Sequence, residues 1–226
     1  MIIEIENLKK VYNSTHVPVH ALNGIDLSFE KSEFAAVVGP SGSGKTTLLN
    51  IVGGLDDATE GKVIIGGTDI GDLGGVKKTD FRLRNIGFVF QAFNLIPVLT
   101  ALENVEFVMH LQKWPKQKRR KRATELLEAV GLGDRLDSRP NKLSGGQQQR
   151  VAVARALASK PTFVLADEPT ASLDSKSSEN LLDIMEQLNK NEEITFIFST
   201  HDPRVMKKAR RVITVEDGKV VKDEKK

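Results

Sequence analysis

The 226-residue chain has no cysteine, a single tryptophan, a single tyrosine and no long apolar run. Without cysteine it can form neither disulfides nor thiolate metal sites. One Trp and one Tyr offer no aromatic platform on which the bases of single-stranded nucleic acid could stack. No segment reaches the ~18 consecutive apolar residues of a membrane-spanning helix, and the N-terminus lacks a signal-peptide core. We therefore expect a chain that is soluble by itself and has no nucleic-acid partner.

The chain also lacks a large excess of either charge, since 33 basic and 30 acidic residues leave a net charge of only +3. The densest basic run is "KWPKQKRRKR" at 113–122. Such a run favours the solvated face of a helix, and contact with anionic lipid or nucleic acid is the alternative. The length fits one large domain or one domain with an inserted subdomain.

Short apolar runs alternating with helical patterns predict an α/β fold with a mainly parallel sheet. The runs lie at 33–39, 85–91, 162–168 and 194–200, and the helical patterns at about 45–54, 103–112, 116–130, 145–158 and 175–190. Two N-terminal strands, near 2–6 and 18–29, are joined by a polar loop at 13–18, and a hairpin closes the chain at 212–223. From about 92 to 141 the pattern indicates helices without strands, which predicts a helical subdomain inserted in the sheet.

Each buried run is followed by polar residues suited to phosphate chemistry. A glycine-rich loop follows the first, Gln91 the second, Asp167 and Glu168 the third, and His201 the fourth. Ligands of open α/β sheets bind beyond the carboxyl ends of the strands. We therefore expect these residues to converge on one site.

The loop "GPSGSGKT" at 39–46 fits the pattern of a P-loop, with an apolar strand before it and a helix after it. Its backbone N–H groups and the helix N-terminus suit the phosphates of a nucleoside triphosphate. The residues predicted to bind ATP here are Gly39, Pro40, Ser41, Gly42, Ser43, Gly44, Lys45, Thr46 and Thr47. The fold class is thus a P-loop NTPase core with N-terminal antiparallel strands and an inserted helical subdomain.

The remaining strand ends supply the predicted chemistry of hydrolysis. Thr46, Asp167 and Gln91 are predicted ligands of Mg²⁺, and Glu168 is the predicted general base for an attacking water. His201 and Gln91 are predicted to contact the nucleotide and to hold Glu168 and the water in place. Tyr12 is a candidate for stacking on the adenine.

A second glycine-containing stretch, "NKLSGGQQQRVAVARALA" at 141–158, also has phosphate-binding character. Ser144, Gly145 and Gly146 stand at the start of an amphipathic helix, where N–H groups and the helix dipole favour an anion. Because the first loop already surrounds one nucleotide, the second is useful if it grips the nucleotide of another copy.

These motifs resemble the nucleotide-binding subunits of the ABC (ATP-binding cassette) ATPases over nearly the whole chain. The matching segments, in family order, are Walker A "GPSGSGKT" (39–46), the Q-loop Gln91, the signature "LSGGQ" (143–147), Walker B "FVLADE" (163–168), the D-loop "SLD" (172–174) and the switch histidine His201. The resemblance implies one ABC ATPase domain, with a core at 1–91 and 159–226 and a helical subdomain at about 92–158.

The resemblance also implies that two subunits pack head to tail around ATP and Mg²⁺. Residues that would contact the partner's ATP are Ser144, Gly145, Gly146, Gln147 and Asp174. The second subunit would be another copy of this chain or a homologue.

More specific segments, such as "NIGFVFQAFNLIPVLTALENV", resemble the macrolide-export and lipoprotein-release branch, whose ATPases pair with FtsX-like membrane subunits. This implies a peripheral place on the cytoplasmic face of the cell membrane, with a permease segment docking near Gln91 and residues 92–107. Ser32 stands where this branch usually has Gly, and Ala171 and Ser172 where it has Gly-Asn. We expect the first change to affect only stability and the second to alter communication between sites.

Three functions remain compatible with the sequence. The first is the ATPase of an export or lipid-extraction transporter. The second is a mechanical coupler like the cell-division ATPase that pairs with FtsX, and only the membrane partner separates these two. The third, a soluble ABC protein of DNA repair or translation, is disfavoured because there is one cassette and no long coiled coil between Lys45 and Asp167.

Overall fold

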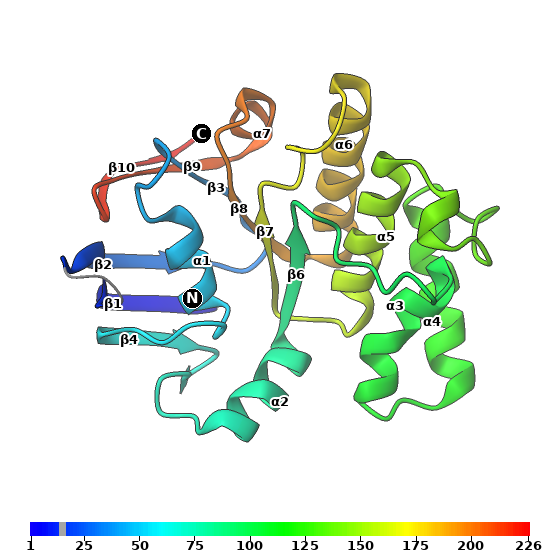
Figure 1. Ribbon diagram of the computed structural model, residues 1–226, viewed down its shortest axis with the longest axis horizontal. Helices are drawn as coiled ribbons and strands as arrows, with labels where there is room; N and C mark the ends of the chain where they lie inside the picture. The colour runs from blue at the N-terminus through cyan, green and yellow to red at the C-terminus, as the bar shows by residue number, and fades with distance from the viewer. Residues whose placement is uncertain (14–16) are drawn as a thin grey trace.

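The computed structural model, which describes residues 1–13 and 17–226, has the α/β fold that the sequence predicts (Figure 1). Residues 14–16 of the predicted loop at 13–18 lie outside the described part. A six-stranded sheet has the order β10-β9-β3-β8-β7-β6, with β9 through β6 parallel and β10 antiparallel. Its strands are β3 (Phe34–Val38), β6 (Ile86–Phe90), β7 (Phe163–Asp167), β8 (Thr195–Ser199), β9 (Arg211–Glu216) and β10 (Lys219–Lys225). The four apolar runs and the final hairpin are thereby confirmed.

A second sheet is antiparallel and has the order β2-β1-β4-β5. It contains β1 (Ile3–Tyr12), β2 (Val19–Phe29), β4 (Glu60–Ile65) and β5 (Thr68–Asp69). The predicted strand at 2–6 is too short, because β1 continues past its register shifts to Tyr12. Strands β4 and β5 were not predicted, because the apolar run of β4 is only three residues long, at 63–65, and β5 has two polar residues.

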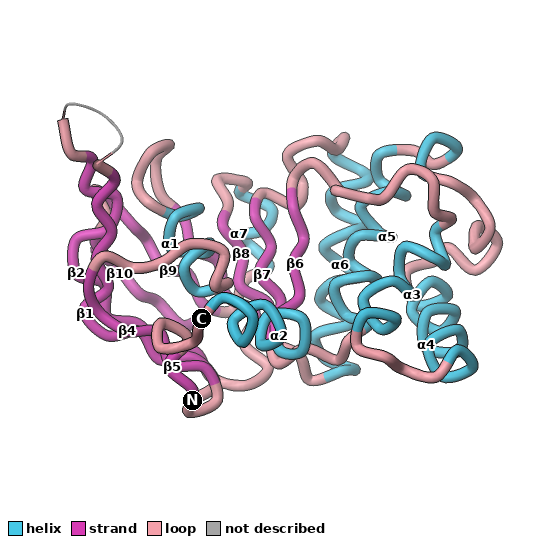
Figure 2. The backbone as a smooth tube through the Cα atoms, turned by 60° about the horizontal axis from the view of Figure 1, so that its bottom comes forward, coloured by secondary structure: helices cyan, strands magenta, loops and turns pink. Residues whose placement is uncertain are grey.

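The helices lie between the sheets and at the far side of the parallel sheet (Figures 1 and 2). Five helices match predicted ranges: α1 (Lys45–Val52), α3 (Ala101–Leu111), α4 (Lys116–Ala129), α5 (Gly145–Ala158) and α6 (Ser175–Glu192). Helices α2 (Gly75–Asn85) and α7 (Pro203–Lys208) were not predicted, and a 3₁₀ turn spans Pro140–Lys142. Helix α2 buries none of its residues, so it lacks the apolar stripe by which a sequence reveals a helix.

The core has two layers, one on each face of the six-stranded sheet. Phe34, Ala36 and Val38 of β3 pack into the layer shared with α3 to α6, while Ala35 and Val37 face α1 and the antiparallel sheet. Both faces of a central strand are buried, which explains its unbroken apolar run. Residues of α3, α4 and α5 share one buried cluster with the strands, so packing does not separate a helical subdomain from the core. The subdomain boundary at about 92–158 stays a prediction.

The parallel strands end at one level of the sheet. Their register pairs Val37 with Ser199, Ser199 with Asp167, and Asp167 with Phe90. The loops that follow these strands therefore start side by side at one edge. Among the described residues, no helix is long and apolar enough to cross a bilayer.

Candidate nucleotide-binding site

The glycine-rich loop between β3 and α1 can exist only with glycine at two of its positions. A Cβ on Gly39 would lie 2.0 Å from the Val215 carbonyl oxygen, and one on Gly44 would lie 2.4 Å from that of Ala21. Both have positive φ, 150° and 102°. At Gly42, with φ of 79°, nothing lies within 4 Å of an added Cβ. The loop is thus packed against the sheet at its ends and open to a ligand at its middle.

Lys45 holds its ammonium group inside this loop. Its Nζ donates to the carbonyl oxygens of Gly39 (2.9 Å) and Pro40 (2.8 Å), and the residue is only 9% exposed. The Ser43 hydroxyl is buried and has no hydrogen-bond partner within residues 1–13 and 17–226, and Gly44 caps α1 without a side chain. A lysine, an unpaired hydroxyl and uncapped helix N–H groups together fit a phosphate chain. Pro40, Ser41 and Thr46 of the same loop are exposed.

Thr46 and Asp167 form a pair of oxygen donors beside the loop. The Thr46 Oγ1 lies 3.3 Å from Asp167 Oδ1. Gln91 is exposed and directly follows Phe90, which pairs with Asp167 on the neighbouring strand. The described part of the chain has no cluster of three or more His, Cys, Asp or Glu residues that could hold a metal alone. Hydroxyl, carboxylate and amide oxygens fit Mg²⁺, which takes its other ligands from phosphate and water.

Glu168 has its carboxylate fixed from both sides. Its Oε1 lies 2.7 Å from His201 Nδ1, and its Oε2 accepts a hydrogen bond from Thr200 Oγ1 at 3.2 Å. The Glu168 side chain is 18% exposed, whereas that of His201 is 76% exposed. The sheet edge therefore brings together Glu168 and His201, as the sequence predicts.

Thr200 is a site residue that the sequence did not single out. It is fully buried, and its Oγ1 also accepts from the Asp202 N–H at 3.0 Å. Thr170 in turn donates to Asp202 Oδ2 at 2.7 Å. Burial alone would raise the pKa of Asp202, but hydrogen bonds from Arg204 and Thr170 outweigh it, so that pKa is lowered. Threonine beside a histidine at a strand end was the only sequence signal for this network.

Tyr12 lies near the start of α1, where its hydroxyl donates to Asp56 Oδ2 at 2.7 Å. Burial and the hydrogen bond to Asp56 raise the pKa of Tyr12, and a hydrogen bond with Thr47 opposes them. The Lys10 ammonium lies 4.8 Å from the ring centroid. Stacking on adenine stays a prediction.

The second glycine stretch begins α5 in a capping box. The Ser144 Oγ accepts from the Gln147 N–H at 3.3 Å, and Gln147 Oε1 accepts from the Ser144 N–H at 2.8 Å. Helices α1 and α5 lie on opposite sides of β6 and β7, so the two glycine stretches are separated within the chain (Figures 1 and 2).

Asp174 lies next to this second stretch. It caps α6, accepting from the Ser177 N–H at 2.9 Å and the Ser177 hydroxyl at 2.6 Å. These hydrogen bonds, that from the Ser177 hydroxyl first, lower the pKa of Asp174. An added Cβ on Gly146 would lie 3.1 Å from Ser177, and one on Gly145 would lie 3.9 Å from the Ser172 carbonyl oxygen. The fold thus presents Ser144, Gly145, Gly146, Gln147 and Asp174 as one surface.

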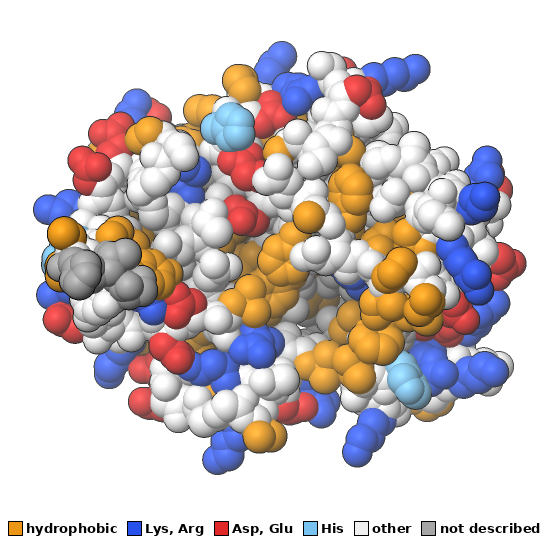
Figure 3. All heavy atoms as spheres, viewed as in Figure 1, with side chains coloured by type: hydrophobic (Ala, Val, Ile, Leu, Met, Phe, Trp, Pro, Cys, Tyr) orange, Lys and Arg blue, Asp and Glu red, His pale blue; other side chains and the backbone are white. Residues whose placement is uncertain are grey.

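An apolar groove of 420 Å³ lies between α2, β6 and α3. Hydrophobic side chains gather in the hollowed centre of the face shown in Figure 3. The groove is lined by Leu55, Thr79, Arg82, Leu83, Ile86, Gly87, Phe88, Phe90, Asn94, Val108, Arg155, Ala156 and Ser159. It reaches the strand end that carries Gln91.

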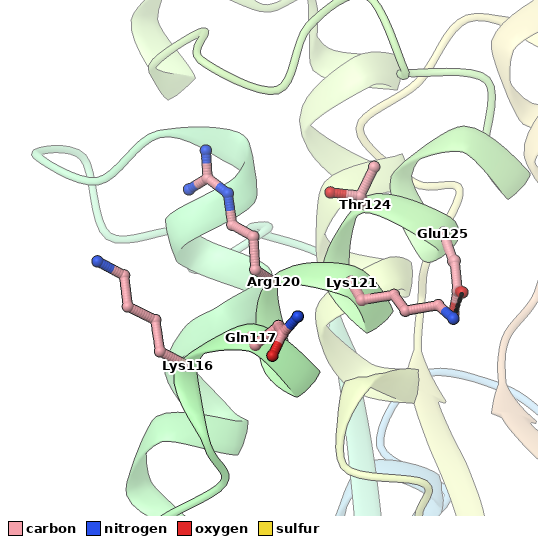
Figure 4. A pocket seen from close by; sticks show the side chains of 6 residues that line it. All are labelled: Lys116, Gln117, Arg120, Lys121, Thr124 and Glu125. Atoms are coloured by element: carbon pink, nitrogen blue, oxygen red, sulfur yellow. Dashed lines mark ion pairs between the residues drawn. The ribbon is translucent and has the colours of Figure 1, made fainter.

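A wider surface hollow on α4 contains none of the predicted site residues. Its 870 Å³ is lined by Lys116, Gln117, Arg120, Lys121, Thr124 and Glu125 (Figure 4). Lys121 lies 4.0 Å from Glu125, and Arg120 lies 3.7 Å from Glu106. These pairs agree with the interpretation of the basic run as a charged helix face.

Comparison with known proteins gives a consistent match. A family model described as ABC transporter matches residues 22–171. An uncharacterized ABC transporter ATP-binding protein of Thermotoga maritima is 47% identical over 97% of this chain and 93% of its own length. The macrolide export ATP-binding/permease protein MacB of Aggregatibacter actinomycetemcomitans is 45% identical over 100% of this chain, which spans only 35% of MacB.

A solved structure agrees in fold over the same length. It shows the ATP-binding cassette MJ0796, a protein of Methanocaldococcus jannaschii, as a dimer in a post-hydrolysis state bound to ADP and Pi. The two chains superpose with a TM-score of 0.90 at 44% identity, covering 99% of this chain and 98% of the other.

Proposed function

The chain belongs to the ABC transporter family as one of its ATPase subunits, and we propose that it drives a separate permease of the export or lipid-extraction kind. The observation that carries the ATPase part of this proposal is the alignment of four strand ends at one edge of the sheet. The residues at these ends are Lys45, Gln91, Asp167, Glu168 and His201. A site of this composition binds and hydrolyses a nucleoside triphosphate by positioning and charge stabilisation.

In the proposed mechanism, the glycine loop and Lys45 hold the phosphates of ATP. Thr46, Asp167 and Gln91 would hold Mg²⁺, which neutralises charge on the phosphate oxygens. Glu168 takes the proton of the attacking water, and His201 and Thr200 keep its carboxylate in place. Lys45 would exchange its two carbonyl partners for phosphate oxygens.

We further propose that two subunits enclose each ATP, with the signature of one over the P-loop of the other. Support comes from the separation of the two glycine stretches in the chain and from the dimer reported for MJ0796. Ser144, Gly145, Gly146, Gln147 and Asp174 would contact the partner's nucleotide. Closure on ATP and release after hydrolysis would then supply the motion that drives the permease.

The apolar groove between α2, β6 and α3 is the proposed docking site of the permease. Its lining contains apolar side chains and two guanidinium groups, those of Arg82 and Arg155, and no carboxylate. MacB, a relative whose name joins an ATP-binding and a permease part, supports a membrane partner. An FtsX-like subunit would place this chain at the cytoplasmic face of the cell membrane.

Purification of the tagged chain from native membranes tests this function. We expect one integral membrane protein to co-purify with it and to be lost when Leu83 in the groove is changed to Glu. Recovery without a membrane protein, or with DNA or ribosomes, would contradict the proposal.

A further inference from the structure

Gln149 of α5 joins the two strand ends that carry the proposed chemistry. The residue is fully buried, and its Nε2 donates to the carbonyl oxygens of Phe90 (3.1 Å) and Pro169 (2.8 Å). Phe90 directly precedes Gln91, and Pro169 directly follows Glu168. One side-chain amide therefore sets the spacing between the backbones that present the metal-ligand candidate and the general-base candidate.

The other half of the same amide is left unsatisfied. Gln149 Oε1 is buried and has no hydrogen-bond partner among the described residues. A buried polar atom without a partner costs about 1–3 kcal/mol, a cost that an apolar side chain of similar length would avoid. The unpaired Oε1 offsets part of the stability that the two donated hydrogen bonds contribute. Stability alone therefore does not explain a glutamine at this position, and the two hydrogen bonds indicate a positioning role.

Arg155, six residues further along α5, holds the other end of the segment 91–94, which follows β6. Its guanidinium donates to the carbonyl oxygens of Asn94 (2.5 Å) and Phe93 (2.8 Å), two residues with positive φ. Gln91 thus lies in a short segment held at both ends by the helix whose N-terminus is the signature. Movement of α5 would carry the Gln91 segment with it.

We propose that Gln149 is a positioning residue for Gln91, placing its amide to reach the metal bound with ATP. This inference rests on the proposed role of Gln91 as a metal ligand. In physical terms, the loss of the Phe90 contact frees the end of β6, and Gln91 then spends less time within reach of the ion. Residues that orient metal ligands in this way have measurable effects on metal affinity.

Manganese binding to the ATP-loaded chain tests the proposal without turnover. The Glu168→Gln variant serves as the parent, with Mn²⁺ as the probe, protein in excess over ATP, and free Mn²⁺ measured by electron paramagnetic resonance. We expect Gln149→Met to weaken Mn²⁺ binding about tenfold. Gln148→Met is the matched control, because the Gln148 amide donates to the Leu143 carbonyl oxygen instead. It should bind Mn²⁺ like the parent.

A double variant shows whether Gln149 acts through Gln91. If it does, Gln91→Ala and Gln149→Met together weaken Mn²⁺ binding no more than the stronger single change. Additive losses, or a Gln149→Met variant with parental affinity, would overturn the inference. If Gln91→Ala itself has no effect, the proposed metal role of Gln91 fails first.

A second substitution at the same position distinguishes lost positioning from a folding defect. Gln149→Asn keeps an amide but is one methylene too short to span both carbonyls, so it should weaken Mn²⁺ binding in the same way. Melting temperatures of all variants are compared, and parental Mn²⁺ affinity in Gln149→Asn would also count against the inference.

Discussion

Glu168 is the residue on which the proposed chemistry converges, and its backbone is unusual. Its φ is 46°, a left-handed conformation that non-glycine residues seldom adopt, and its N–H donates to the Ser199 carbonyl oxygen at 2.9 Å. Such conformations persist where the surroundings impose them, and they cluster at functional sites. Here the turn points the carboxylate back toward His201 and Thr200 rather than outward.

Replacing Glu168 by Gln should separate binding from hydrolysis. The amide keeps the shape of the side chain but cannot accept a proton, so we expect phosphate release to fall by about 10²- to 10⁴-fold. Binding of a fluorescent ATP analogue should stay the same, because Lys45 and the glycine loop are untouched. Glu179→Gln, on the exposed face of α6, is the control and should hydrolyse ATP normally.

Thr200→Val should lower both turnover and stability. It removes the donor to Glu168 Oε2 and leaves the buried Asp202 N–H without its acceptor, at a cost of about 1–3 kcal/mol. We expect kcat to fall while KM for ATP changes little. Thr200→Ser retains the hydroxyl and should restore kcat; equal kcat in the Val variant and the native chain would exclude a positioning role.

At the scale of elements, burial decides what the sequence could predict. The four central strands and helices α1, α3, α4, α5 and α6 carry apolar patterns and match their predicted ranges. Helix α2 buries no residue, and β4 and β5 have too few apolar residues in a row to be recognised, so all three were missed. The predicted site residues follow strand ends, whereas Thr200 and Gln149 act through hydrogen bonds between distant segments, which periodicity cannot reveal.

Ser32 shows how a turn can tolerate a departure from the family pattern. Its φ of 63° lies in the region that favours glycine, and its hydroxyl donates to the Glu193 carbonyl oxygen at 3.0 Å. This hydrogen bond offsets part of the backbone strain. The turn precedes β3, whereas the glycine loop follows it, so the two lie at opposite ends of one strand. That the change affects only stability stays a prediction.

The packing of β6 on α5 depends on Gly87. A Cβ there would lie 2.5 Å from the Ala156 carbonyl oxygen, so Gly87→Ala must push the strand and the helix apart. We expect a loss of about 1–3 kcal/mol in the free energy of unfolding, measured with urea. Gly75→Ala, in the first turn of α2 where nothing lies within 4 Å of an added Cβ, should not lower it.

The hairpin of β9 and β10 should make stability depend on pH in acid. The hydrogen bond from Arg211 lowers the pKa of Asp223, with N···O distances of 2.7 and 2.8 Å. A carboxylate with a lowered folded-state pKa stabilises the fold above its unfolded pKa of about 3.9, and the effect is lost as pH falls through the folded pKa.

Thermal unfolding between pH 3 and 7 should therefore show a melting temperature that falls below about pH 4. Asp223→Asn should melt lower at neutral pH and show a flatter acid limb. An acid limb equally steep in this variant would assign the effect to other carboxylates with lowered pKa, such as Glu192, which pairs with Arg122.

At the scale of the whole molecule, the two glycine stretches that we propose to bind phosphate lie apart. One contains Lys45 and lies beside Asp167, Glu168 and His201; the other starts α5 and lies beside Asp174. Within one chain they cannot enclose the same ligand, since β6 and β7 stand between their helices. This separation supports the proposal that the second stretch is half of a site that another subunit completes.

The mass of the Glu168→Gln variant in solution, measured by size-exclusion chromatography with light scattering, tests this most directly. With ATP and Mg²⁺ we predict a dimer, and with ADP a monomer. Adding Ser144→Arg should prevent dimerisation by ATP while leaving nucleotide binding intact, because the larger side chain blocks only the partner's γ-phosphate. A Glu168→Gln chain that binds ATP yet stays monomeric at high protein concentration would contradict the account.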